Sequence, residues 1–221
     1  MFGPRFARHR AARYRKRGLD RTARRMIDWL VSQGIEDAAV LDIGGGVGEL
    51  GLALLQRGAG SATTLELTPA YDGPAATLAA EAGLTDRVRR RIGDIATDGT
   101  VAEPADVVVL HRVVCCYPDV DRLLGAAADH ARRVVVLSHP RRSVLLRLLL
   151  GLQNALQRVF GGEYRAYAHP PAAMLSVLRD HGFAAEHLYR GPIWQVIVAR
   201  RVSTGSSHLY AEAEVPLSAA G

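Results

Sequence analysis

The segment Val40-Leu41-Asp42-Ile43-Gly44-Gly45-Gly46-Val47-Gly48-Glu49-Leu50 decides the fold. Its apolar start predicts a buried β-strand, and its end predicts the first turn of a helix. Asp42 and three alternating glycines form the pattern Asp-x-Gly-x-Gly-x-Gly between them. Glycine lets the backbone turn sharply and approach a ligand closely, and the helix start offers unpaired N–H groups. The segment therefore predicts a loop that binds a nucleotide-shaped cofactor through its backbone.

Two classes of cofactor fit such a loop. Gly46, Gly48 and Gly51 match the dinucleotide pattern G-x-G-x-x-G, in which a pyrophosphate lies at the helix N-terminus. Asp42 argues against a dinucleotide, because a carboxylate at the end of the strand repels a pyrophosphate and attracts the ammonium and sulfonium of S-adenosylmethionine. The charge therefore favours the methyl donor.

Polar residues also end the next apolar segments. Residues 62–65 lead into Glu66, whose carboxylate would accept from both hydroxyls of a ribose. Residues 88–92 lead into Gly93 and Asp94, and an aspartate there would accept from an adenine amino group. Residues 105–110 lead into His111. Doubly wound sheets bind ligands at the carboxyl ends of their strands, so these side chains are expected at one site.

The predicted elements alternate between strands and helices. After an arm and a helix that run to about residue 34, we expect strands at 39–43, 62–66, 88–92, 105–110, 133–138, 183–189 and 192–200, and helices at 48–57, 73–83, 119–131 and 169–181. Such alternation implies a parallel sheet with right-handed crossovers. The predicted fold class is α/β, with a doubly wound, mostly parallel, Rossmann-like sheet of seven strands.

Length and composition predict one main domain. The chain has 221 residues, 48% of them hydrophobic, which is enough to bury a full core. We expect a basic helical arm over 1–34, the main domain over 35–202 with inserted lid or substrate helices at 141–182, and a disordered tail over 203–221. Cys115 and Cys116 have neither a disulfide nor a zinc spacing, so no metal site and a reducing cytoplasm are expected. The charged N-terminus lacks the apolar core of a secretion signal.

The positive charge is concentrated in the arm. Residues 1–25 hold ten of the 28 basic side chains and one of the 22 acidic ones, Asp20, so the other residues carry 18 basic and 21 acidic side chains. Three roles are open for the arm: a solvated helix, a lid over the cofactor or substrate, or contact with an anionic partner such as RNA or an acidic membrane.

A second apolar segment spans residues 141–160. It is rich in leucine but contains Arg147 and Arg158, so it is too short and too charged to cross a bilayer. It would pack in the core, cover an apolar substrate, or lie on a membrane surface. A cytoplasmic protein with peripheral membrane contact stays an alternative for this reason.

Taken together, these motifs resemble class I S-adenosylmethionine-dependent methyltransferases over about residues 26–201. Residues 42–48 match the first motif of that family, Glu66 the acidic end of the second strand, and Gly93-Asp94 the adenine-side motif. The resemblance implies S-adenosylmethionine as cofactor, the methionine part beside Asp42 and the loop, the ribose at Glu66 and the adenine at Asp94. The full set that it implies for the cofactor is Asp42, Gly44, Gly45, Gly46, Gly48, Glu66, Leu67, Asp94, Ile95 and His111.

Methyl transfer needs an acceptor aligned with the methyl group and, for a hydroxyl or amine, a group that removes a proton. His111 is the best-placed candidate base after the fourth strand, and Tyr117 and His169 are further candidates. A histidine after a buried strand also commonly bonds a loop carbonyl. Cys115 and Cys116 have no local cation partner and are expected to be packed.

The acceptor is expected to be a small apolar or anionic molecule, with O-methylation favoured. An Asn-Pro-Pro-Tyr motif of base methyltransferases is absent after the fourth strand. Residues 113–118 resemble a segment of magnesium-protoporphyrin O-methyltransferases, which also have a Phe- and Arg-rich N-terminal arm, but Cys116 stands where that family has a histidine. The alternatives are an RNA methyltransferase that uses the arm, a nicotinamide-dependent oxidoreductase, and a binding protein without turnover.

Overall fold

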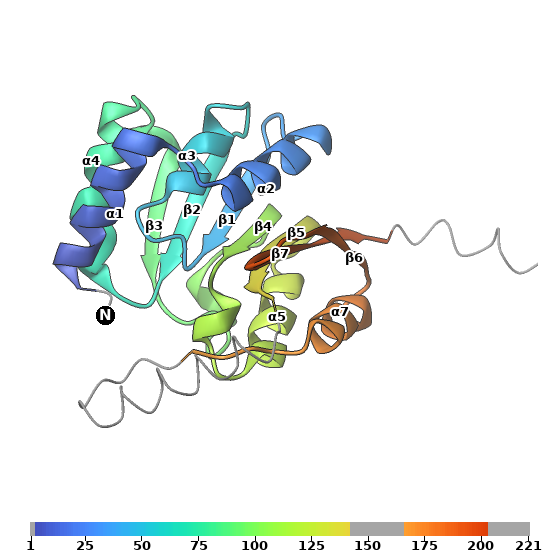
Figure 1. Cartoon of the computed structure of the whole chain (residues 1–221). Helices are drawn as coiled ribbons and strands as arrows, with labels where there is room; N and C mark the ends of the chain where they lie inside the picture. The colour runs from blue at the N-terminus through green and yellow to red at the C-terminus, as the bar shows by residue number, and fades with distance from the viewer. Residues whose placement is uncertain (1–2, 142–165, 203–221) are drawn as a thin grey trace, which may run out of the picture.

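The computed structural model describes residues 3–141 and 166–202 (Figure 1). Its strands are β1 (Ala39–Ile43), β2 (Ser61–Glu66), β3 (Val88–Ile92), β4 (Ala105–His111), β5 (Ala131–Pro140), β6 (Phe183–Arg190) and β7 (Trp194–Arg201). Its α-helices are α1 (Pro4–Arg17), α2 (Arg21–Ser32), α3 (Glu49–Leu55), α4 (Asp72–Glu81), α5 (Val120–Asp129) and α7 (Pro171–Asp180). The expected apolar helix at 141–160 and the expected tail lie outside the described residues, apart from residue 141.

The strands form one seven-stranded sheet in the order β3-β2-β1-β4-β5-β7-β6. The first five strands pair in parallel, and β7 is antiparallel to both β5 and β6. The predicted α/β, mostly parallel sheet is confirmed. The order reverses between β1 and β4, and this is the switch point where doubly wound sheets open a crevice for a ligand.

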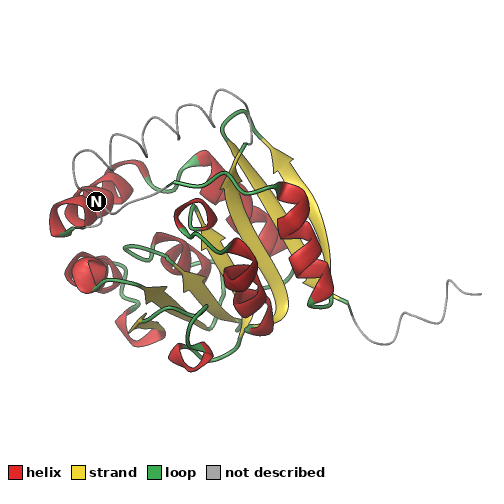
Figure 2. Cartoon of the chain, turned by 90° about the horizontal axis from the view of Figure 1, so that it is seen from below, coloured by secondary structure: helices red, strands yellow, loops and turns green. Residues whose placement is uncertain are grey.

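Helices cover both faces of the sheet (Figure 2). One face buries valines of β4 and β5 against residues of α2 and α3, among them Met26 and Leu54. The other face buries Leu110 and Leu137 against α5 and α7. β1 and β4 are buried along nearly their whole length, as expected for central parallel strands with near-continuous apolar sequence.

The N-terminal region forms two helices, α1 and α2, with a turn between them. Gly18 ends α1 with a positive φ of 63°, and Asp20 begins α2 by accepting from the N–H groups of Thr22 and Ala23. The chain therefore turns at Gly18, so that α1 packs against α4 (Figure 1). Ala7 and Ala11 are the buried positions of α1, and their small side chains let the arm lie close to α3 and α4.

The carboxyl ends of β1, β2, β3 and β4 thus meet along one edge, with the N-terminal half of α1 beside them. No helix in the described ranges combines the length and apolar character needed to cross a membrane.

Candidate active site

The glycine loop joins β1 to α3 and requires its glycines for two separate reasons. Gly44, Gly46 and Gly48 have φ values of 64°, 61° and 80°, in the left-handed region that side chains avoid. Gly45 has no such φ, but a Cβ there would lie 2.3 Å from Oδ2 of Asp42. The loop therefore lies directly on the Asp42 carboxyl group.

Asp42 is fully buried beneath the loop and does not line the cavity described below. Neither of its carboxyl oxygens has a hydrogen-bond partner in the structure. Burial, with the negative charges of Glu49 and Glu66 nearby, raises its pKa well above the ordinary value. A cation above the loop would relieve this cost, which fits the ammonium and sulfonium of the expected cofactor.

Glu66 ends β2 beside the loop. Its Oε1 accepts from the Gly46 N–H at 2.5 Å, so one oxygen holds the loop. Arg90 of β3 supports the same loop by donating from Nη1 to the Gly46 carbonyl at 3.1 Å and from Nε to Asp72 at 2.8 Å. Burial raises the pKa of Glu66, and the bond from Gly46 opposes that rise.

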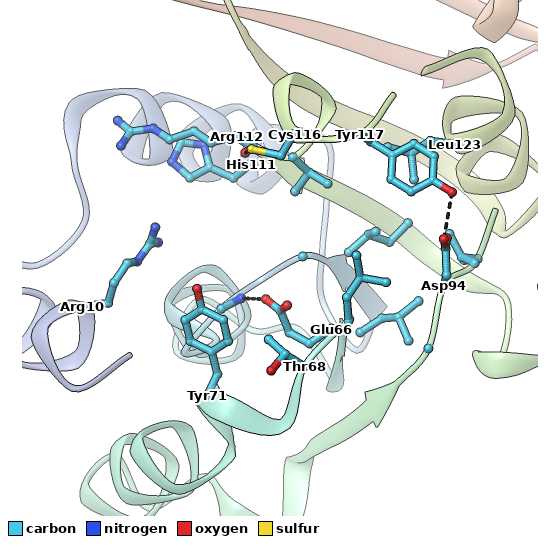
Figure 3. Close-up of a pocket in the computed structure, with 18 of the residues that line it drawn as sticks. Arg10, Glu66, Thr68, Tyr71, Asp94, His111, Arg112, Cys116, Tyr117 and Leu123 are labelled. Carbon is cyan, nitrogen blue, oxygen red and sulfur yellow. Dashed lines mark hydrogen bonds between the residues drawn. The ribbon is translucent and has the colours of Figure 1, made fainter. Parts of the chain in front are cut away.

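Asp94 follows β3 on the opposite side of the cavity. Its Oδ1 accepts from the Ala96 N–H at 3.0 Å, and its Oδ2 accepts from the hydroxyl of Tyr117 at 2.8 Å (Figure 3). Burial and the bond to Asp94 raise the pKa of Tyr117 to about 12. Tyr117 therefore stays protonated at neutral pH and serves here as a hydrogen-bond donor.

Glu66, Asp94 and Tyr117 all line one cavity. It spans about 880 Å³ of space between protein atoms, part of which is open solvent. Its walls come from α1, the ends of the first four strands and the segment after β4 (Figure 3). The lining residues are Phe6, Arg10, Ile43, Gly44, Gly46, Leu65, Glu66, Leu67, Thr68, Tyr71, Gly93, Asp94, Ile95, His111, Arg112, Val113, Cys116, Tyr117 and Leu123. Of the predicted cofactor residues, Asp42, Gly45 and Gly48 lie behind this lining.

The arm contributes Phe6 and Arg10 to the cavity wall. Arg10 forms an ion pair with Glu49, the first residue of α3 after the glycine loop. Farther along α1, Arg15 pairs with Glu81 of α4 at 2.7 Å. Of the three roles open for the arm, this geometry favours a cover over the cavity.

Both ring nitrogens of His111 are occupied. The backbone N–H of Arg112 donates to Ser138 Oγ at 2.9 Å, and the same Oγ lies 2.9 Å from His111 Nδ1. Nε2 lies 3.4 Å from Oδ2 of Asp20. A carboxylate oxygen accepts, so the ring proton is on Nε2 and Nδ1 accepts from the Ser138 hydroxyl. His111 therefore lines the cavity without presenting a free lone pair to it.

His169 has a different arrangement. Its Nε2 lies 2.9 Å from the carbonyl oxygen of Tyr117, and its ring stacks on Tyr167 at 5.6 Å between centroids. A carbonyl only accepts, so Nε2 carries the proton and the neutral ring has its lone pair on Nδ1. His169 lies behind the segment after β4 and outside the cavity lining. Cys115 and Cys116 both face the Arg112 carbonyl, and the contact between the two thiols, together with burial, raises the pKa of Cys115, as expected for packed cysteines.

A sequence model of the family described as "Methyltransferase domain" matches residues 6–188, which is most of the chain. The chain belongs to this methyltransferase family. It is an enzyme of the S-adenosylmethionine-dependent class, and the predicted family and cofactor are confirmed. The buried Asp42, the loop, Glu66 and Asp94 are chemically suited to this cofactor, whose ammonium, ribose and adenine offer cationic and donor groups.

Solved methyltransferase structures share the fold. Magnesium protoporphyrin IX methyltransferase from Synechocystis PCC 6803 with bound S-adenosylhomocysteine has a TM-score of 0.67 and 24% identity, with 82% of each chain covered. An O-methyltransferase family protein from Burkholderia thailandensis has a TM-score of 0.65 and 20% identity over 83% of this chain and 57% of that one. An O-methyltransferase family 2 protein from Planctomyces limnophilus, in complex with apigenin, has a TM-score of 0.66 and 19% identity over 89% and 62%. No curated protein matches the sequence.

Several residues of this methyltransferase site were not predicted from the sequence. Arg10 and Tyr71 line the cavity, and Asp20 contacts it through His111 and Arg112. The sequence did contain one relevant feature, because Asp20 is the single acid among the cations of residues 1–25.

Proposed function

We propose that this enzyme transfers the methyl group of S-adenosylmethionine to a small apolar molecule that carries an anionic group, with O-methylation favoured. The observation that carries this proposal is that the glycine loop, Glu66, Asp94 and Arg112 all line one cavity. Tetrapyrroles and phenols are acceptor classes consistent with it. Two similar structures give the proposal further support: that of magnesium protoporphyrin IX methyltransferase and that of an O-methyltransferase family 2 protein in complex with apigenin.

In this proposal the loop and Glu66 hold the methionine and ribose parts, and Asp94 accepts from the adenine. Leu67, which is 65% exposed, and Ile95 give apolar contact to the adenine ring. The sulfonium supplies the activated methyl group. The side chains of the chain itself position the cofactor and exclude water, which supplies most of the rate enhancement of such a displacement.

Where the acceptor is a hydroxyl or an amine, a base has to take its proton. Among the three candidates, His169 is the one whose neutral ring has a lone pair that none of the described residues occupies. His111 is held by Ser138 and Asp20, and Tyr117 donates to Asp94. His169 lies outside the cavity lining, so none of the three is placed to take a proton from an acceptor in the cavity, and we assign positioning roles to His111 and Tyr117. A carboxylate acceptor needs no base and fits this arrangement, so His169→Gln would leave its methylation largely unchanged.

The test is a transfer assay with radiolabelled methyl donor and two matched acceptors, apigenin and magnesium protoporphyrin, each alongside a total RNA fraction. Transfer to either small molecule supports the proposal, and Arg112→Gln should then raise KM for the more anionic acceptor more than for the other. Transfer to RNA alone, lost on deletion of residues 1–18 and steeply dependent on salt, would instead establish the RNA alternative.

A further inference from the structure

Asp20 both caps the start of α2 and contacts two residues that line the cofactor cavity, Arg112 and His111. Its Oδ1 accepts from the N–H groups of Thr22 and Ala23 at 2.9 and 3.0 Å, which starts α2. Its Oδ2 lies 2.8 Å from Nη2 of Arg112 and 3.4 Å from Nε2 of His111. One carboxylate therefore caps a helix with one oxygen and binds the end of β4 with the other.

Arg112 needs such a partner. It has a left-handed φ of 62°, which is uncommon for a residue other than glycine. Its guanidinium stacks on Trp194 at 4.6 Å and is partly withdrawn from water, and this burial lowers its pKa despite the charge of Asp20. The strained backbone and the desolvated cation are held in place by Asp20 and Trp194 together.

The carboxylate itself is adapted to this role. Burial would raise the pKa of Asp20, but the hydrogen bonds from His111 and the Ala23 N–H, with the charge of Arg112, lower it well below the ordinary value. Asp20 is therefore ionised at every pH at which the protein would function. A second cavity lies at this junction and shares Arg10, His111 and Arg112 with the first.

We propose that Asp20 is a positioning residue of the enzyme, which fixes the arm over the cofactor cavity and orients His111 and Arg112 within it. This role is separate from the proposed function, because it does not depend on which acceptor is methylated. When Asp20 releases Arg112, α1 is still tied by Arg10 to Glu49 and by Arg15 to Glu81, but the turn at residues 18–20 loses its contact with β4. The cavity then opens on the arm side, and a bound cofactor leaves sooner.

Asp20→Asn tests the positioning role while it keeps the cap of α2. Asparagine caps a helix as well as aspartate does, because its side-chain oxygen still accepts from Thr22 and Ala23. It carries no charge for Arg112. Arg15→Gln is the matched control, because it breaks an arm contact that is exposed and distant from the cavity.

The first measurement is the dissociation rate of S-adenosylhomocysteine by surface plasmon resonance. Asp20→Asn should raise this rate about tenfold, with a melting temperature close to that of Arg15→Gln, and Arg15→Gln should leave the rate within twofold of the native enzyme. An unchanged rate in Asp20→Asn would overturn the proposal.

The second measurement needs no cofactor. Amide hydrogen exchange in the ligand-free protein should be faster across α1 and residues 18–20 in Asp20→Asn, while exchange in α5 stays unchanged. Equal exchange in the native protein and the variant would overturn the proposal whether or not the protein binds S-adenosylhomocysteine.

Discussion

The hydroxyl of Tyr117 donates a 2.8 Å hydrogen bond to Asp94, across the cavity from the glycine loop. This bond joins the end of β3 to the segment after β4, and it engages the carboxylate that is assigned to the adenine. A carboxylate oxygen accepts more than one hydrogen bond, so Tyr117 and the adenine amino group can share Asp94.

Tyr117→Phe tests this sharing. We expect it to weaken S-adenosylhomocysteine binding by less than tenfold, because removing one neutral donor leaves the Asp94 carboxyl group in place and still held by the Ala96 N–H. Asp94→Ala removes the acceptor itself and should cost about 1–3 kcal/mol of binding free energy. Calorimetric titration compares the two variants. A larger loss in Tyr117→Phe than in Asp94→Ala would contradict the assignment of the adenine to Asp94.

Glu66→Ala should weaken S-adenosylmethionine by about 1–3 kcal/mol, because it removes the expected ribose acceptor and the support of the Gly46 N–H at once. Glu103→Ala, at an exposed position, is the control and should bind as the native enzyme does. Equal affinities in the two variants would show that the ribose is bound elsewhere.

Gly45→Ala should reduce both stability and cofactor affinity, because its Cβ would lie 2.3 Å from Oδ2 of Asp42 and the loop would have to move. Gly73→Ala in α4 is the matched control, since no atom lies within 4 Å of its added Cβ. It should raise stability by up to about 1 kcal/mol through helix propensity. Thermal melts and calorimetry check both variants. Native-like binding in Gly45→Ala would mean that the loop tolerates displacement from Asp42.

The buried His139 predicts how stability depends on pH. Burial lowers its pKa from 6.5 to about 4, and His187 lies with its ring centroid 6.0 Å away. As the pH falls below 6.5, the unfolded chain takes up a proton at His139 and the folded protein does not, so folding stability is full above pH 6.5 and declines toward pH 4. The slope from this group is about 1.4 kcal/mol per pH unit.

Urea unfolding between pH 7.5 and pH 4.5 measures this slope. His139→Gln replaces the ring with a group that does not titrate, and it should flatten the decline between pH 6.5 and pH 4.5. An identical slope in the native protein and in His139→Gln would assign the acid sensitivity to other groups.

The sheet and the cofactor motifs could be predicted because their information is local. Residues 40–50 carry a strand, a turn and a helix start in sequence, and the acidic residues after β2 and β3 follow from the same alternation. β1 and β3 match the predicted bounds, and β5 begins at Ala131 instead of residue 133 because its first residue pairs with Ala105 of β4. The strands β6 and β7 lie close to the ranges expected for them, 183–189 and 192–200.

The connections to the arm could not be predicted, because they join residues far apart in sequence. Asp20 and His111 are 91 positions apart, and Arg10 and Glu49 are 39 apart. No periodicity links such pairs. The choice among His111, Tyr117 and His169 likewise depends on which ring nitrogen or hydroxyl is already bonded, and this is a property of the packed structure.

The most direct test of the account is isothermal titration calorimetry of the native enzyme with S-adenosylhomocysteine and with NAD, repeated for Asp94→Ala. We expect S-adenosylhomocysteine to bind, NAD not to bind, and Asp94→Ala to weaken the binding of S-adenosylhomocysteine by about 1–3 kcal/mol. Binding of NAD in place of S-adenosylhomocysteine would contradict this expectation and would identify the Gly46-x-Gly48-x-x-Gly51 pattern as a dinucleotide site.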